Sequence, residues 1–207
     1  MPDYFLNALV TLFVTIDPIG LAPIFMALTT GMALADRRQA AIRAAVTAGA
    51  VLVAFALVGE ALIGVLGISL PAFRIAGGLL LFVIAFEMVF ALREERKSVT
   101  AGQPGGDGGA HDLAIFPLAI PLTSGPGAIS ATILLASEAD GAFELAGLLV
   151  IIAALIGACL AVFLLADRIE RILGPTGRVV VGRLLGVILA ALAVQFVADG
   201  VMTIARG

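Results

Sequence analysis

The feature that most constrains the fold is the recurrence of long apolar stretches along the whole chain. A helix needs about 20 residues to cross the roughly 30 Å hydrocarbon layer of a bilayer. With 61% hydrophobic residues, 13% charged residues and a mean hydropathy of +1.17, no water-soluble core could hide so much apolar surface. We therefore predict an all-α polytopic membrane protein of six transmembrane helices, in contact with the lipid bilayer. The expected spans are 4–30, 41–67, 71–92, 113–137, 145–166 and 179–204.

A charged and glycine-rich segment, 93–112, divides the chain into two halves of three spans each, 1–92 and 113–207. Most of the 12 basic residues fall in or beside the first, third and fifth connections, whereas only Arg74 and Arg206 fall on the other face. Because positive residues concentrate on the cytoplasmic side of a membrane, this segment should be a cytoplasmic loop. Both termini should then face outward from a bacterial inner membrane.

Two landmarks recur with nearly the same spacing in the two halves. Three spans per half is an odd number, so the second half must enter the membrane from the opposite side. The sequence therefore predicts two inverted three-helix repeats, an architecture that recurs in secondary transporters with the substrate bound where the repeats meet. The matched landmarks are Asp17-Pro18 with Gly125-Pro126, 108 residues apart, and Arg74-x-x-Gly77 with Arg183-x-x-Gly186, 109 residues apart.

Clusters of proline and glycine interrupt the first and fourth spans near their middles. Proline removes a backbone donor and clashes with the preceding turn, so continuous helix is not expected there. Each break should yield two half-helices that face a shared interior, because bare amides are not tolerated in lipid. The N-terminal ends suit a carboxylate, and the C-terminal carbonyls suit an ammonium group or a cation. Together they would fit a zwitterion such as an amino acid.

Asp17 is the only charge in the central turns of any span. An ionised carboxylate there costs roughly 3 kcal/mol unless it is partnered or wetted, which makes Asp17 the candidate for coupling to a proton or sodium ion. The alternative is that Asp17 caps a helix that begins at Pro18, and both roles can hold together. The candidate substrate-binding residues are Thr15, Asp17, Pro18, Gly20, Thr123, Ser124, Gly125, Pro126 and Gly127, with Ser130 as a further hydroxyl nearby.

Charges nearer the span ends, Glu60, Arg74, Glu87 and Asp199, are expected to reach the interface. Gln195 lies deeper and would line the cavity or bridge helices. The single cysteine excludes disulfides and cysteine-based metal sites. We expect no cofactor, no bound metal and no nucleic-acid partner, while a glycine pair at 77–78 leaves open a homo-oligomer as well as close packing within the chain.

Two other classes of function were weighed against a transporter. An intramembrane serine protease would need a base beside Ser124, but the only histidine, His111, falls in the loop and no lysine falls in any span. An aspartyl protease would need two apposed acids, and Asp199 falls near the wrong end of its helix. We therefore do not expect an enzyme. A channel or an exporter of another small solute or drug stays as the main alternative.

The two broken segments together resemble the paired signature of the MarC family. The resemblance covers essentially the whole chain, including the six spans, the charged central loop and the arginine that opens the third span. It implies a relationship to LysE-type exporters, and some proteins of the family are described as transporters of small neutral amino acids such as glycine and alanine. The expected function is thus alternating-access transport of such amino acids. The matching segments are Asp17-Pro-Ile-Gly-Leu-Ala-Pro-Ile-Phe25 and Pro121-Leu-Thr-Ser-Gly-Pro-Gly-Ala-Ile129.

Overall fold

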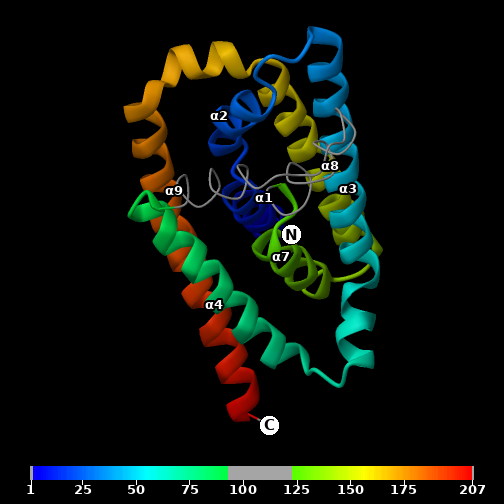
Figure 1. Cartoon of the computed structure of the whole chain (residues 1–207). Coiled ribbons are helices and arrows are strands. Elements are labelled where there is room, and N and C mark those ends of the chain that lie inside the picture. The colour runs from blue at the N-terminus through cyan, green and yellow to red at the C-terminus, as the bar shows by residue number, and fades with distance from the viewer. Residues whose placement is uncertain (1, 93–122, 207) are drawn as a thin grey trace.

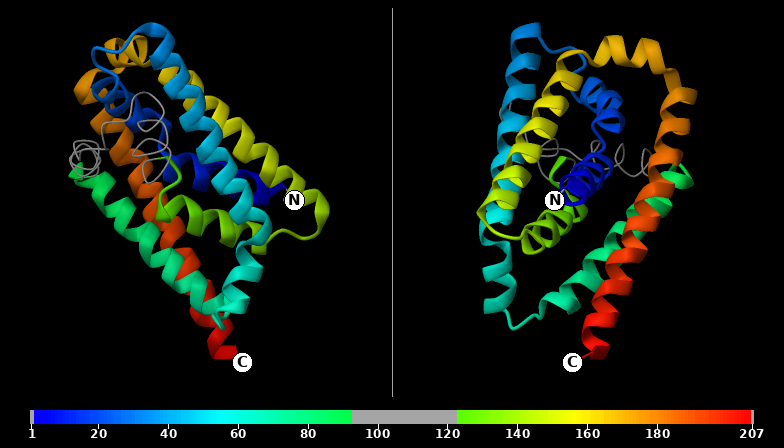
Figure 2. Two further views of the ribbon diagram at one scale, coloured as in Figure 1. Left: turned by 45° about the vertical axis from the view of Figure 1, so that its right-hand side comes forward. Right: turned by 180° about the vertical axis from the view of Figure 1, so that it is seen from behind.

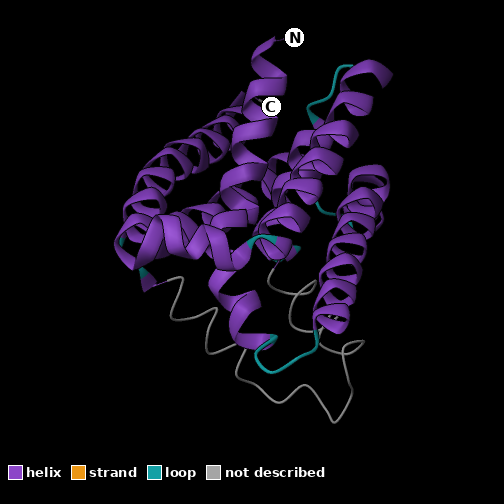
Figure 3. Ribbon diagram, turned by 90° about the horizontal axis from the view of Figure 1, so that it is seen from above, coloured by secondary structure: helices purple, strands orange, loops and turns teal. Residues whose placement is uncertain are grey.

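The computed structural model describes residues 2–92 and 123–206, and all regular structure in these ranges is helical (Figure 3). Five stretches are long and apolar enough to cross a membrane, and α7 is a shorter apolar helix. The start of the expected fourth span, 113–122, lies outside the described residues. The helices are α1 (Pro2–Ile16), α2 (Pro18–Leu28), α3 (Leu34–Val65), α4 (Leu70–Val89), α7 (Pro126–Ser137), α8 (Ala142–Leu164) and α9 (Ala166–Arg206).

Helix boundaries follow from local chemistry. Ser69 caps α4 by accepting a hydrogen bond from the Ala72 amide at 3.4 Å, and a proline follows in the first turn. The sixth expected span differs from the sequence-based boundaries. Instead of starting at Val179 after a connecting loop, α9 is helical from Ala166 onward and is kinked at Gly174, whose φ of 59° suits only glycine without strain. The fifth connection is therefore mostly helix.

The central element of the molecule is the α1–α2 pair. In Figures 1 and 2, α1, α2 and α7 lie between α3 and α8 on one side and α4 and α9 on the other. About 67% of the apolar window of α1–α2 is buried within the protein, against 28% or less for the other four long stretches. The outer helices therefore carry the surface that contacts lipid, whereas α1 and α2 are enclosed by protein.

Helices α4 and α9 run antiparallel and pack closely along their length (Figure 1). Small residues permit this approach, because a Cβ atom at Gly78 would lie 2.8 Å from Val197 and 2.9 Å from the Ala193 carbonyl oxygen. Gly186 and Gly200 face α4 in the same way. The glycine pair at 77–78 thus serves packing within the chain: Gly78 faces α9, and Gly77 faces Leu134 of α7.

Candidate functional site

The chain leaves the helical conformation at Asp17, between α1 and α2. Asp17 has φ 55° and ψ 65°, and its carboxylate accepts a hydrogen bond from the Gly20 amide at 3.1 Å. Pro18 occupies the first turn of α2. Because Pro18 and Pro23 have no amide hydrogen, the carbonyls of Val14 and Ile19 receive no helical bond from them. Asp17 is therefore the N-cap of α2.

Gly20 allows the Asp17 carboxylate to sit over the first turn of α2. A Cβ atom at Gly20 would lie 2.2 Å from one carboxylate oxygen and 2.9 Å from the other. Both distances are shorter than a van der Waals contact, so a larger residue would displace the carboxylate. The glycine is required here by the position of the acid rather than by an unusual backbone angle.

The second candidate segment, 123–127, ends a described range and leads into α7. Thr123 and Ser124 are each 1% exposed. Gly125 precedes α7 in an extended conformation, and Pro126 is its first residue. A Cβ atom at Gly127 would lie 3.4 Å from Cγ2 of Thr15, so the last turn of α1 touches the first turn of α7. The structure thus brings Thr15 and Gly127 together from the two halves of the chain.

Buried hydroxyl groups surround this contact on both helices. Thr15 donates a hydrogen bond to the Thr11 carbonyl, and Thr132 donates to the Ala128 carbonyl at 2.7 Å. Both bonds return to the residue's own helix, as hydroxyls in membrane helices often do. Ser130, which is 7% exposed, lies on α7 near Gly77. Both helices thus carry buried hydroxyl groups beside their apolar side chains.

A small cavity of about 30 Å³ adjoins Asp17 and Gly20. A cavity of this volume is large enough to hold a water molecule. The described residues that line it come from Asp17 and α2, from Met88 at the end of α4 and Ala91 just after it, and from α9, including Arg178 and Gly182; none comes from 123–127. The cavity therefore places Asp17 opposite α4 and α9 rather than opposite the start of α7.

Arg178 is the residue at this cavity that sequence reasoning missed. It was assigned to the fifth connection, because it precedes the apolar run that begins at Val179. In the structure it lines the same cavity as Asp17. The sequence signal for Arg178 was its position directly before a predicted span. Its place beside the first half of the chain also depends on residues 176–178 being helical, which the sequence pattern did not predict.

Two further predicted polar residues have specific partners. Arg74 pairs with Glu138 at 3.0 Å instead of only reaching the interface. Gln195 donates a hydrogen bond to Asp199 at 2.8 Å on its own helix, at an exposed position. Asp199 lies with Arg74 and Arg206 in a surface depression at one end of the molecule. It is therefore not apposed to Asp17 in the way an aspartyl protease would require.

Over 2–92 and 123–206, no group of three or more His, Cys, Asp or Glu side chains could hold a metal ion. His111, the residue considered as a base for Ser124, lies outside the described residues. The arrangement offers a helix N-terminus, a carboxylate and a guanidinium around a small cavity, which suits the recognition of small charged groups.

Comparison with known proteins finds membrane proteins that are similar over nearly the whole chain. A model of the MarC family integral membrane protein matches residues 2–205. A UPF0056 membrane protein of Methanocaldococcus jannaschii is 35% identical over 204 residues, covering 96% of each chain. The UPF0056 membrane proteins YhcE of Escherichia coli and YvbG of Bacillus subtilis are each 32% identical, with 100% and 97% of this chain and 95% of each relative covered. No solved structure matches the chain.

Proposed function

Because the chain belongs to the MarC family of integral membrane proteins, we propose that it is a secondary transporter of small neutral amino acids such as glycine and alanine. The observation that supports this proposal is the contact between the end of α1 and the start of α7, at Thr15 and Gly127. We assign it no enzymatic role. The relationship to LysE-type exporters is part of the same proposal.

The local chemistry supports a zwitterionic substrate. The first-turn amides of α2 and α7 carry partial positive charge, and Arg178 adds a full positive charge at the cavity beside α2. These groups suit a carboxylate. The Asp17 carboxylate and the last carbonyls of α1 suit an ammonium group. Because the cavity beside Asp17 is only about 30 Å³ in this conformation, the site would admit even a substrate with little or no side chain only after it opens.

An inverted repeat is supported by the way the helices pair. Pro18–Leu28 of α2 and Pro126–Ser137 of α7 begin 108 residues apart, as do α3 at Leu34 and α8 at Ala142. α2 packs against α8 and α9, and α7 packs against their counterparts in the first half, α3 and α4. A two-fold axis that exchanges the halves would produce this reciprocal pairing. Transporters built from such repeats bind substrate at the repeat interface.

Coupling to a proton or sodium ion is proposed to act through Asp17. A carboxylate within a span that is enclosed by protein can exchange its charge with a bound cation or proton during the transport cycle. Alternating access would then expose the region around Asp17 to one side of the membrane at a time. We propose a bacterial plasma-membrane location in which the end of the molecule that carries Arg37 faces the cytoplasm and both termini face outward.

The test is uptake of radiolabelled glycine and alanine into proteoliposomes under an imposed proton or sodium gradient. The expected result is saturable accumulation that collapses when the gradient is dissipated. Protein-free liposomes and a large aromatic amino acid serve as controls. Absence of uptake under either gradient would contradict the proposal, whereas flux that rises linearly with concentration would identify a channel instead of a carrier.

A further inference from the structure

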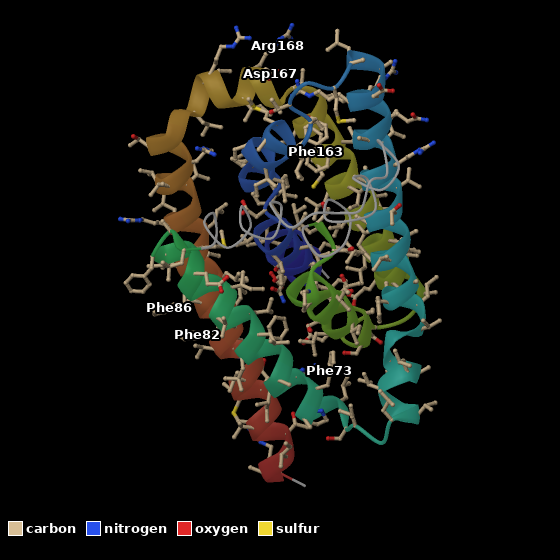
Figure 4. All side chains as sticks on the ribbon, viewed as in Figure 1. Phe73, Phe82, Phe86, Phe163, Asp167 and Arg168 are labelled. Carbon is tan, nitrogen blue, oxygen red and sulfur yellow. The ribbon has the colours of Figure 1, made fainter. Side chains whose placement is uncertain are left out.

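Two ion pairs between described residues lie at opposite ends of the molecule. Arg37 in the first turn of α3 pairs with Asp167 of α9 at 3.0 Å, and Arg74 near the start of α4 pairs with Glu138 at 3.0 Å. Figure 4 shows Asp167 at one end and Phe73, next to Arg74, towards the other. We call these the α2 end and the α7 end, because α2 ends beside the first pair and α7 ends beside the second.

At the α2 end, the ion pair covers an aromatic stack. The Arg37 guanidinium lies 5.4 Å from the centroid of the Phe25 ring, and Phe25 stacks on Phe163 of α8 at 4.8 Å. Both rings are fully buried. A guanidinium over a ring face is attracted by the ring's negative charge distribution. Arg37 therefore joins α3 and α9 to the last turns of α2.

An open depression of about 470 Å³ lies at the α2 end, lined by Arg37, Asp167 and the turn that follows α2. A second depression of about 470 Å³ lies at the α7 end, lined by Arg74 with Asp199, Met202, Thr203 and Arg206 of α9. Each ion pair contributes a residue to the wall of one depression. Between the two ends lies the cavity of about 30 Å³ at Asp17, the smallest of these three hollows lined by described residues.

Each ion pair lies about the length of one short helix away from the start of α2 or α7. α2 has 11 residues and α7 has 12, which correspond to about 16 and 18 Å at 1.5 Å per residue. Movement of α2 or α7 would therefore connect an outer depression with the breaks. Each ion pair lies beside the C-terminal end of one of these helices.

We propose that Arg37–Asp167 and Arg74–Glu138 are the two gates of the transport cycle, which break in turn to admit substrate to the Asp17 region from the α2 end or from the α7 end. This inference rests on the proposed transport function. The conformation described here has both pairs formed and corresponds to the closed state between the two open ones.

The partial exposure of the pairs fits a role in opening and closing. The side chains of Arg37 and Asp167 are 21% and 52% exposed, and those of Arg74 and Glu138 are 20% and 24% exposed. Partly exposed pairs contribute little net stability, since water compensates the separated charges. They can therefore break during a transport cycle without unfolding the protein.

The gates can be tested by the accessibility of a cysteine in the central cavity. The reporter is Ile19→Cys, since Ile19 lines the cavity with Asp17, in a Cys159→Ala background that removes the only native cysteine. A membrane-impermeant methanethiosulfonate reagent is added to one side of oriented vesicles. The gate variants are Asp167→Asn and Glu138→Gln. The control for Asp167→Asn is Asp36→Asn, and the control for Glu138→Gln is Asp140→Asn. No ion pair of either control acid is found within the described residues.

Asp167→Asn should raise the labelling rate about two- to fivefold from the α2 end only, the change expected when an exposed ion pair is lost. Glu138→Gln should do the same from the α7 end only. The charge exchange Arg37→Asp with Asp167→Arg restores an ion pair but loses the Arg37–Phe25 contact, so it should lower the rate part of the way back towards that of the reporter alone. It also tests the gate if Asp167→Asn fails to fold. Labelling that rises equally from both ends, or that matches the Asp36 and Asp140 controls, would overturn the gate assignment.

Because labelling needs no substrate, its result is independent of the amino acid proposal. If labelling changes from one side only but neither glycine nor alanine is taken up, the gate assignment is supported and the amino acid substrate is rejected. If the amino acids are taken up but the gate variants do not change labelling from one side only, the transport function is supported and these residues are not its gates.

Discussion

Gly20→Ala should separate the stability of α2 from the function of Asp17. The new Cβ atom would lie 2.2 Å from a carboxylate oxygen of Asp17, so the carboxylate must move by about 1 Å or more to restore contact distance. It would then release the Gly20 amide, which costs about 1 kcal/mol for a lost N-cap. Alanine in place of glycine in a helix gains about 1 kcal/mol. The two changes nearly cancel, so the free energy of unfolding should change by less than about 1 kcal/mol.

Transport should respond much more strongly than stability. The site depends on the position of one carboxylate, and a displacement of about 1 Å at a functional group can reduce its effect about 100-fold. The measurement pairs thermal unfolding in detergent with gradient-driven uptake in proteoliposomes. Gly157→Ala is the control, because a Cβ atom at Gly157 meets nothing within 4 Å. Uptake of Gly20→Ala that equals the Gly157→Ala control would refute the role given to the Asp17 carboxylate.

Three further predictions concern separate parts of the structure. Asp17→Asn keeps a capping side chain but removes the charge, so folding should survive while gradient dependence of uptake is lost; unchanged dependence on the gradient would reject the coupling role. Gly78→Leu should destabilise the α4–α9 contact by at least about 1–3 kcal/mol, because its Cβ would meet Val197 and a backbone carbonyl. The control is Gly64→Leu, which should have little effect on thermal unfolding because nothing lies within 4 Å of a Cβ atom at Gly64. Burial raises the pKa of Glu138 above its usual 4.5 despite the opposing effect of Arg74. The contribution of this carboxyl to stability is therefore fully present below pH 4.5 and is lost as the pH rises through its pKa in the folded protein. Glu138→Gln should remove this part of the pH dependence of unfolding, and identical pH profiles for the variant and the parent protein would contradict the prediction.

The helical membrane fold followed from the sequence because apolar length alone decides it. Apolar stretches of about 20 residues that recur along the whole chain, with few or no charges in each, indicate membrane-spanning helices. The cap at Asp17 was also accessible, since Asp before Pro is a strong helix-start signal. These features depend on neighbours in the sequence, which is why they could be predicted without tertiary information.

The remaining features depend on contacts between distant segments. The ion pairs join residues 130 and 64 positions apart, Arg37 with Asp167 and Arg74 with Glu138. The sequence pattern placed Arg74 near a span end but identified no partner for it. The place of Arg178 was missed because the fifth connection was taken as a loop, while α9 is helical through it after the kink at Gly174. Tertiary packing, not local propensity, determines these arrangements.

The most direct test of the central claim is glycine counterflow in proteoliposomes loaded with unlabelled glycine. This exchange needs no imposed gradient and therefore does not depend on which ion is coupled. A transporter of small neutral amino acids should accumulate external labelled glycine transiently, and alanine should compete while a large aromatic amino acid should not. Labelled glycine that enters no faster than into protein-free liposomes would contradict the claim.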